Sequence, residues 1–96
     1  MLHLIFQSPM AEAIIGRIGS GDGVVFMGSA VLQLLRAGHL NSALGELSEH
    51  SPLYALADDL ATRGITEDEL VQGVTLIDYA GLVALTVKHP VIQSWT

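Results

Sequence analysis

The residue types that most often carry chemistry lie scattered along this chain. The four histidines are His3, His39, His50 and His89, and they fall in different predicted elements. Two metal ligands on one helix are typically four residues apart, and no two of these histidines have that spacing. The histidine pattern therefore predicts no metal site.

Serine, histidine and aspartate all occur, but their arrangement indicates no hydrolase. The chain lacks the Gly-x-Ser-x-Gly sequence that presents the nucleophile in one large class of hydrolases. Asp58-Asp59 could be paired catalytic carboxylates. Adjacent acids at the start of a short helix, however, more often interact with the positive end of the helix dipole. Lys88-His89 at a helix C-terminus has a similar structural interpretation, in which cations interact with the negative helix end.

Residues 19–23, GSGDG, share only their glycine content with a phosphate-binding loop. The segment lacks the Gly-Lys-Ser/Thr of a P-loop. It also follows a predicted helix and precedes a strand, the reverse of the order in a dinucleotide-binding fingerprint. A plain turn between helix and strand is the stronger prediction.

Composition excludes several classes of function. The chain has no cysteine, which rules out disulfides, thiolate metal sites and persulfide formation on this chain. Four Lys and Arg against ten Asp and Glu give a formal charge of -6, so the chain by itself is a poor candidate for binding nucleic-acid phosphates. Hydrophobic residues make up 50% of the 96 residues and charged residues 15%, which favours burial in an oligomer.

Short apolar runs alternate with segments of helical spacing. The runs predict strands at 2–6, 24–27, 53–56 and 74–77, and the tail at 91–96 is a candidate fifth strand. Helices are predicted from Ser8-Pro9, over 30–37, over 40–47, over 58–63 and over 79–89, with a capping box at Thr66–Glu69. Strands that are apolar throughout, such as 74–77, suit burial on both faces of a parallel sheet.

These elements predict an α/β fold. We expect a small single domain over residues 1–96, with a mainly parallel four- to five-stranded sheet and helices on both faces. No apolar run approaches the roughly 18 residues that span a bilayer, so no membrane contact is predicted. The first residues lack the basic region and cleavage site of a signal peptide, which makes the cytoplasm the default location.

The last predicted helix is unusually apolar for so small a protein. Asp78 is placed to cap its N-terminus, and Pro90 to end it. Apolar side chains cover more than half of its circumference, whereas a surface helix normally has one apolar stripe. We therefore predict a subunit interface formed by Tyr79, Leu82, Val83 and Val87, with Trp95 near the same surface. Trp95 has a second interpretation, in which it folds back onto its own domain.

Several segments, in their order and spacing, resemble the TusB/DsrH family. They are Met1-Leu2-His3, Ser8-Pro9, Tyr54-Ala55-Leu56, Asp59-Leu60, Arg63-Gly64, Leu76-Ile77-Asp78-Tyr79, Leu85-Thr86-Val87-Lys88-His89-Pro90 and Trp95. No single segment is specific for this family. The order and spacing of all the segments, together with the chain length, are specific for it. The resemblance covers essentially the whole chain and is weakest over residues 28–51.

This resemblance implies a DsrE/DsrF/DsrH-like fold and a place in a sulfur-relay complex. The implied partners are TusC-like and TusD-like subunits, assembled as a dimer of heterotrimers, and a TusE-like acceptor. In this family the complex passes persulfide sulfur toward the 2-thiouridine at the wobble position of certain tRNAs. In sulfur-oxidising bacteria the related complex serves dissimilatory sulfur oxidation.

The resemblance also bears on the role of this chain within such a complex. Some DsrH-type relatives carry a cysteine in the first helix, where this chain has Ala13-Ile14-Ile15-Gly16. Since a persulfide requires a thiolate, the implied role is that of a non-catalytic subunit, with the TusD-like subunit supplying the cysteine. No cofactor and no direct nucleic-acid contact are implied, and the isolated chain is expected to be able to self-associate.

A second hypothesis remains open, that of a stand-alone α/β enzyme or small-ligand binder. Folds of this class bind ligands at the carboxyl ends of their strands. The residues predicted there are Ser8, Ser29, Asp58 and Asp78. No arrangement among them specifies a reaction.

Overall fold

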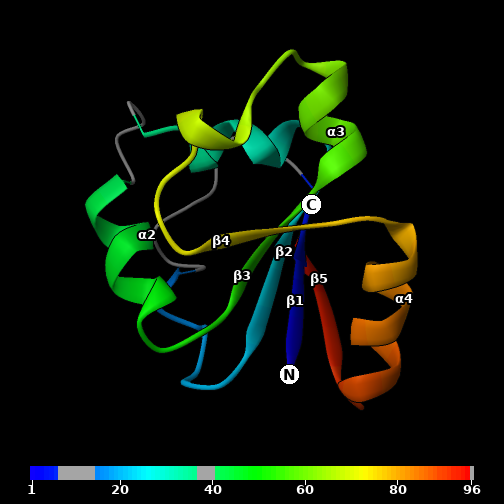
Figure 1. Cartoon of the computed structure of the whole chain (residues 1–96). Coiled ribbons are helices and arrows are strands. Elements are labelled where there is room, and N and C mark those ends of the chain that lie inside the picture. Colours follow the sequence, from blue (N-terminus) through cyan, green and yellow to red (C-terminus); the bar gives the residue numbers. More distant parts are fainter. Residues whose placement is uncertain (7–14, 37–40, 96) are drawn as a thin grey trace.

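Five parallel strands form one sheet in the computed structural model, which describes residues 1–6, 15–36 and 41–95 (Figure 1). The strands are β1 (Leu2–Ile5), β2 (Gly23–Phe26), β3 (Leu53–Leu56), β4 (Val74–Ile77) and β5 (Ile92–Trp95). Their order across the sheet is β4-β3-β2-β1-β5, and every neighbouring pair is parallel. The predicted α/β fold is confirmed, including the candidate fifth strand.

Burial differs sharply between the middle of the sheet and its edges. All four residues of β2 are buried, because the sheet is covered on both faces. β4 lies at an edge, and its residues are partly or fully exposed. The prediction that 74–77 is buried on both faces was wrong, because a short apolar run does not distinguish a central strand from an edge strand.

The larger core lies on one face of the sheet, under helix α2 (Asn41–Ser48) and the 3₁₀ helix η1 (Gly28–Leu34). The helix predicted over 30–37 is thus a 3₁₀ helix that begins earlier, at Gly28. Gly28 has a φ of +57°, and a Cβ there would lie 2.9 Å from the carbonyl oxygen of Phe6. Only glycine fits this approach of the end of β1 to the start of η1.

Two short helices connect β3 to β4. Helix α3 (Ala57–Thr62) ends before Gly64, whose φ of +68° is readily adopted by glycine. The 3₁₀ turn η2 (Glu67–Glu69) follows, and the Glu69 carboxylate accepts the N–H of Thr66 at 3.0 Å. The helix predicted over 58–63 and the capping box are both confirmed.

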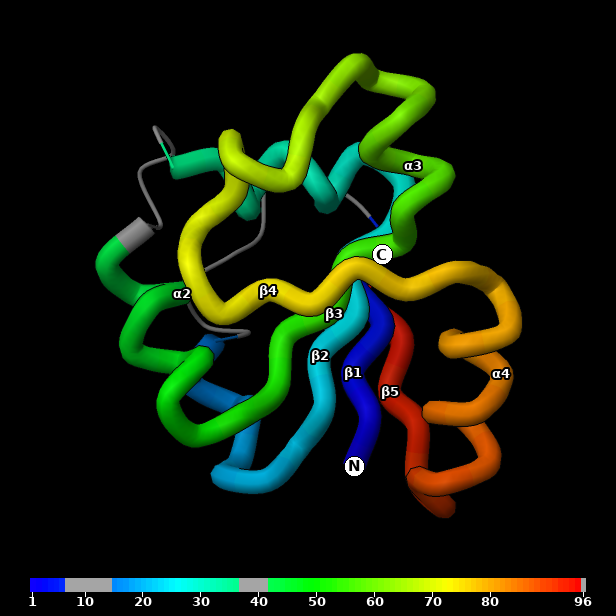
Figure 2. The backbone as a smooth tube through the Cα atoms, viewed as in Figure 1, coloured from blue at the N-terminus to red at the C-terminus, as the bar shows by residue number. Residues whose placement is uncertain are grey.

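Helix α4 (Tyr79–Lys88) carries the chain from β4 at one edge of the sheet to β5 at the other, on the side opposite α2 (Figure 2). The Asp78 carboxylate accepts the N–H of Gly81 at 2.8 Å, which confirms the predicted N-cap. Leu85 is buried and Leu82 partly buried in a second, smaller core with side chains from β1, β2 and β3. Within the described residues, no helix is long and apolar enough to cross a membrane.

Several sequence predictions lie wholly or partly outside the described residues. They include the helix start at Ser8-Pro9, most of the segment 13–16 where relatives carry a cysteine, the last residue of the helix predicted over 30–37 and the first residue of the helix predicted over 40–47.

Candidate functional site

Helix α4 presents an apolar surface to solvent. Tyr79, Val83 and Val87 are 57%, 60% and 81% exposed. They are spaced four residues apart and therefore form one stripe along the helix. Ala80 and Ala84 are exposed beside this stripe, and Lys88 is the one charged residue among the exposed residues of α4. The outer α4 face is defined here as Tyr79, Ala80, Val83, Ala84 and Val87.

Two of the predicted interface residues do not belong to this face. Leu82 points toward the sheet and packs against the core that contains Leu85. Trp95 pairs in register with Ile5 and packs against the larger core, across the sheet from α4. The prediction that Trp95 lies near the same surface as Val83 was wrong, because successive residues of β5 point to opposite faces and Trp95 points to the face that carries the larger core. Trp95 instead folds back onto its own sheet.

The exposed apolar surface continues along the chain beyond α4. Val91 and Ile92 are 52% and 42% exposed, and Ile92 begins the edge strand β5. The outer α4 face contains no acidic residue, although the chain as a whole carries a formal charge of -6. A partner protein could therefore approach this surface without meeting the chain's excess negative charge at the point of contact.

A second group of side chains forms a polar cluster on the opposite face of the sheet. His3 on β1 is 1% exposed. Its Nε2 lies 3.0 Å from Oδ2 of Asp22, and its Nδ1 lies 3.1 Å from the indole nitrogen of Trp95. The guanidinium carbon of Arg17 lies 5.9 Å from the centroid of the Trp95 ring. Four parts of the chain thus meet around one buried imidazole.

The contacts assign different roles to the two ring nitrogens of His3. An indole nitrogen can only donate a hydrogen bond, so Nδ1 of His3 must be the acceptor and Nε2 must carry the hydrogen that is donated to Asp22. Hydrogen bonding from His3, with further donors in the Gly19 N–H and the Met1 amino group, lowers the pKa of Asp22 to about 2. The arrangement requires neutral His3 and ionised Asp22.

Sequence reasoning missed this cluster. It treated Asp22 only as part of a glycine-rich turn and His3 only as one of four scattered histidines, although His3 is the polar exception in an apolar strand. That exception was the available signal, because a histidine within a buried strand needs partners for both of its ring nitrogens. The identity of the partners could not be found from spacing, since Trp95 lies 92 residues away.

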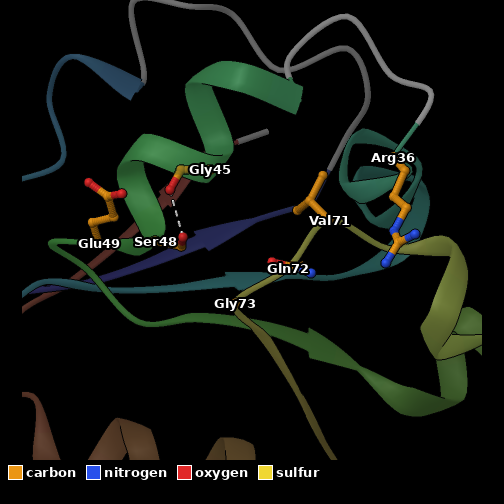
Figure 3. A pocket seen from close by; sticks show the side chains of 7 residues that line it. All are labelled: Arg36, Gly45, Ser48, Glu49, Val71, Gln72 and Gly73. Atoms are coloured by element: carbon orange, nitrogen blue, oxygen red, sulfur yellow. Dashed lines mark hydrogen bonds between the residues drawn. The ribbon is translucent and has the colours of Figure 1, made fainter.

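An open groove of about 640 Å³ lies between the C-terminal half of α2 and the segment leading into β4 (Figure 3). Its walls include Ser48 and Glu49 on one side and Arg36 on the other. The Ser48 hydroxyl donates to the Gly45 carbonyl at 2.7 Å, and Nε of Arg36 donates to the Leu70 carbonyl at 3.1 Å. Both side chains thus make structural hydrogen bonds.

The residues expected for a stand-alone binding site lie away from this groove. Asp58 is exposed on α3, Asp78 caps α4, and Ser29 lies in η1. The neighbouring Asp59 accepts the N–H of Gly28 at 2.8 Å and thereby ties α3 to η1. Ser8 is outside the described residues, and the residues that are described contain no group of histidine and acidic side chains that could hold a metal ion.

Sequence comparison identifies the family. The family described as "DsrH like protein" matches residues 5–92. The chain belongs to this DsrH-like family. Protein TusB of Pectobacterium carotovorum subsp. carotovorum (strain PC1) is 34% identical over 98 residues, which cover 99% of this chain and 100% of that protein. Protein TusB of Escherichia coli (strain K12) is 31% identical over 100 residues, with the same two coverages of 99% and 100%.

Two solved structures share the fold of this DsrH-like protein. MTH1491 of Methanobacterium thermoautotrophicum matches with a TM-score of 0.79 at 17% identity, covering 98% of this chain and 96% of that one. Tm0979 of Thermotoga maritima matches with a TM-score of 0.64 at 22% identity, covering 93% and 94%. Identities this low support the fold alone. The predicted TusB/DsrH resemblance is confirmed by the sequence relatives.

The DsrH-like family is one of sulfur-relay and tRNA-thiolation proteins. Its members generally work in complexes with other sulfur-relay proteins. Proteins that work in complexes need a surface that binds their partners. In this chain the outer α4 face is exposed and apolar, as such surfaces commonly are.

Proposed function

We propose that this protein is a non-catalytic subunit of a sulfur-relay complex that passes persulfide sulfur toward the 2-thiolation of tRNA wobble uridines. The observation that carries the proposal is the absence of cysteine from a chain that belongs to the DsrH-like family. A persulfide can be carried only on a thiol, so the sulfur must travel on another subunit.

The proposed partners are a TusC-like and a TusD-like subunit, in a dimer of heterotrimers that acts in the cytoplasm. The TusD-like subunit supplies the reactive cysteine, and a TusE-like protein accepts the sulfur from the complex. The protein described here contributes surface and shape to the assembly and does not itself contact tRNA. Residues 1–96 act as a single domain in this role.

The outer α4 face is the proposed contact with a neighbouring subunit. Burying one large apolar side chain is worth roughly 1.5–3 kcal/mol relative to leaving it in water. Tyr79, Val83 and Val87 together therefore favour association, and a contiguous apolar patch on a small protein commonly marks an interface. Leu82 supports this face from beneath, since it is partly buried in the core behind it.

Co-expression with TusC-like and TusD-like chains tests the proposal. The three chains should elute together in size-exclusion chromatography. Val83→Glu and Val87→Glu should each remove this protein from the complex, because each would bury a carboxylate without a partner. Lys88→Ala is the matched control on the same helix, and it should leave the complex intact.

Circular dichroism must show that the charged variants remain folded, as the exposure of Val83 and Val87 leads us to expect. Full assembly by both folded glutamate variants would show that α4 is not the contact. Persistent separate elution of the wild-type chains would count against the relay complex itself. A monomer whose melting temperature rises with a small ligand would instead support the stand-alone binding hypothesis.

A further inference from the structure

The C-terminal strand β5 pairs with β1 through its backbone, and its side-chain contacts with the other described residues centre on Trp95. It is an edge strand, and Ile92, Gln93 and Ser94 are all exposed. Trp95 is the only residue of β5 that is partly buried, and it packs against the larger core. Its indole nitrogen donates to Nδ1 of the fully buried His3 at 3.1 Å, a side-chain contact that adds to the backbone pairing of β5 with β1.

We propose that neutral His3 is a pH-sensitive latch that holds β5 on the sheet by accepting the indole hydrogen of Trp95. The lone pair on Nδ1 is the feature that the contact requires. When a proton from solvent binds to this nitrogen, the imidazolium has an N–H at both ring positions. The indole N–H and the new Nδ1–H then face each other as two donors, and the hydrogen bond is lost.

The second ring nitrogen cannot relieve this conflict. Nε2 of His3 already donates to Oδ2 of Asp22 at 3.0 Å, and it still carries its hydrogen after protonation. Rotating the ring to satisfy Trp95 would break the contact with Asp22. The two rings lie nearly parallel, with centroids 6.3 Å apart and planes 19° from parallel, which aligns the indole nitrogen with Nδ1 of His3.

The charges around the cluster act in opposing directions. Among the described residues, the charged groups facing it are the Asp22 carboxylate, the Met1 amino group that pairs with Asp22 at 3.1 Å, and the Arg17 guanidinium over Trp95. The titratable His89 lies near the residue after Asp22, since its Nε2 would be 3.4 Å from a Cβ on Gly23. Gln93 of β5, which pairs with His3 of β1, is uncharged. Asp22 stabilises an imidazolium, while Arg17 and the amino group disfavour one. A proton on Nδ1 would leave the contact with Asp22 in place, so the loss would fall on the bond to Trp95.

Release of Trp95 would also affect the neighbouring elements. Val91, which precedes β5, accepts the N–H of Leu2 at 2.9 Å, and the Trp95 carbonyl accepts the N–H of Phe6 at 3.1 Å. Helix α4 ends at Lys88 and β5 begins at Ile92, so movement of β5 would pull directly on the end of α4. The inference concerns the isolated chain and does not depend on the proposed relay function.

The protein contains one tryptophan, so its fluorescence reports on the latch directly. Imidazole side chains titrate between about pH 5 and 8. We expect the emission maximum of the full chain to shift to the red as pH falls from about 7.5 to about 5.5, a range that stays above the isoelectric point of about 4.8. The wavelength is the readout, because a protonated imidazole beside an indole can quench emission without moving its maximum.

His3→Gln should abolish this shift. Glutamine offers an acceptor to Trp95 and a donor to Asp22, but it does not titrate in this range. His89→Gln is the matched control and should retain the full shift, because His89, although its Nε2 lies near Gly23, makes no hydrogen bond to His3, Asp22 or Trp95 within the described residues. A wild-type chain without a shift, or a folded His3→Gln variant with an unchanged shift, would overturn the proposal.

Hydrogen exchange of the Trp95 indole N–H provides a test if His3→Gln does not fold. In the wild-type chain its protection, corrected for the intrinsic pH dependence of exchange, should be lost over the same pH range. Trp95→Phe, which has no N–H to donate, should make exchange of the β5 backbone independent of pH in this range. Constant protection of the wild-type indole N–H would refute the latch.

Discussion

Asp78 shows how a single side chain defines the start of an element. Its carboxylate accepts the N–H of Gly81 at 2.8 Å, one of the amide groups that a helix start leaves without a partner inside the helix. A Cβ on Gly81 would lie 3.1 Å from that of Ile77, so glycine also lets the chain turn closely from β4 into α4. The cap and this close packing together bring α4 back over the sheet.

We expect Asp78→Ala to reduce the free energy of unfolding by about 0.5–2 kcal/mol, because a backbone N–H loses its acceptor. Asp78→Ser, which also caps helices well, should recover most of the loss. Urea denaturation of the isolated chain measures both values. Equal stability of the alanine and wild-type proteins would show that water replaces the carboxylate at no cost.

Asp22 should make the stability of the fold sensitive to acid. Its pKa is about 2 in the folded protein, below the ordinary value of 3.8, and hydrogen bonding from His3 is the main cause. A carboxylate with a lowered pKa stabilises the fold above its unfolded pKa, and this contribution is lost as pH falls through the folded pKa. The window of loss therefore runs from about pH 4 down to about pH 2.

Asp22→Asn tests this linkage. At pH 6 we expect the variant to be less stable than the wild type by about 1 kcal/mol, because charged hydrogen-bond acceptors are replaced by neutral ones. The gap should narrow as pH falls from about 4 toward about 2, as the wild-type carboxylate becomes neutral too. Denaturation curves at several pH values measure the gap, and a constant gap would contradict the assignment.

At the scale of the element, α4 combines two apolar sides with different roles. Leu85 is 9% exposed and packs in the smaller core, whereas Val87, two residues later, is 81% exposed. The two residues point in different directions because successive helical residues are about 100° apart. The inner side of α4 stabilises the chain, and the outer side is free for a partner.

Leu85→Ala should therefore reduce the free energy of unfolding of the isolated chain by about 2–5 kcal/mol, through loss of buried surface and formation of a cavity. Val87→Ala, which changes the same helix, should alter it by no more than about 0.5 kcal/mol. Chemical denaturation of the two variants distinguishes the sides. A large loss for Val87→Ala would show that its side chain is buried in the isolated chain.

At the scale of the molecule, most of the described acidic residues lie away from the outer α4 face, and the exposed Asp78 that caps α4 is the exception beside it. The exposed acidic side chains on α2, directly after α2, on α3 and on η2 are Glu46, Glu49, Asp58, Glu67, Asp68 and Glu69. In α4, by contrast, the exposed residues other than Lys88 are apolar. Figure 1 shows α2 and α4 on opposite sides of the sheet. If a partner subunit binds the outer α4 face, the acidic residues of α2 on the opposite side of the sheet remain exposed to solvent.

This distribution predicts that the isolated chain does not bind tRNA. Phosphate binding depends on clustered Lys and Arg, and the chain has four such residues against ten acidic ones. A mobility-shift titration at low salt, where any electrostatic attraction would be strongest, should show no saturable complex. Saturable binding that weakens steeply with added salt would reveal a basic surface that this charge distribution does not predict.

The sequence by itself determined the features that depend on near neighbours. Apolar runs predicted the strands, Asp78 and Thr66 predicted helix starts, and the order of short segments indicated the family. These signals depend on interactions within a few residues, so they can be read along the chain. The excess apolar character of α4 was visible for the same reason, as was the absence of a thiol.

The tertiary structure decided which residues of these elements meet and which face outward. The exposed position of β4, the inward side of Leu82 and the face on which Trp95 packs all follow from strand order and register. A shift of one residue in register would have moved Trp95 to the other face of the sheet. The contact between His3 and Trp95 joins residues 92 positions apart, so only the pairing of β1 with β5 could bring the two rings together.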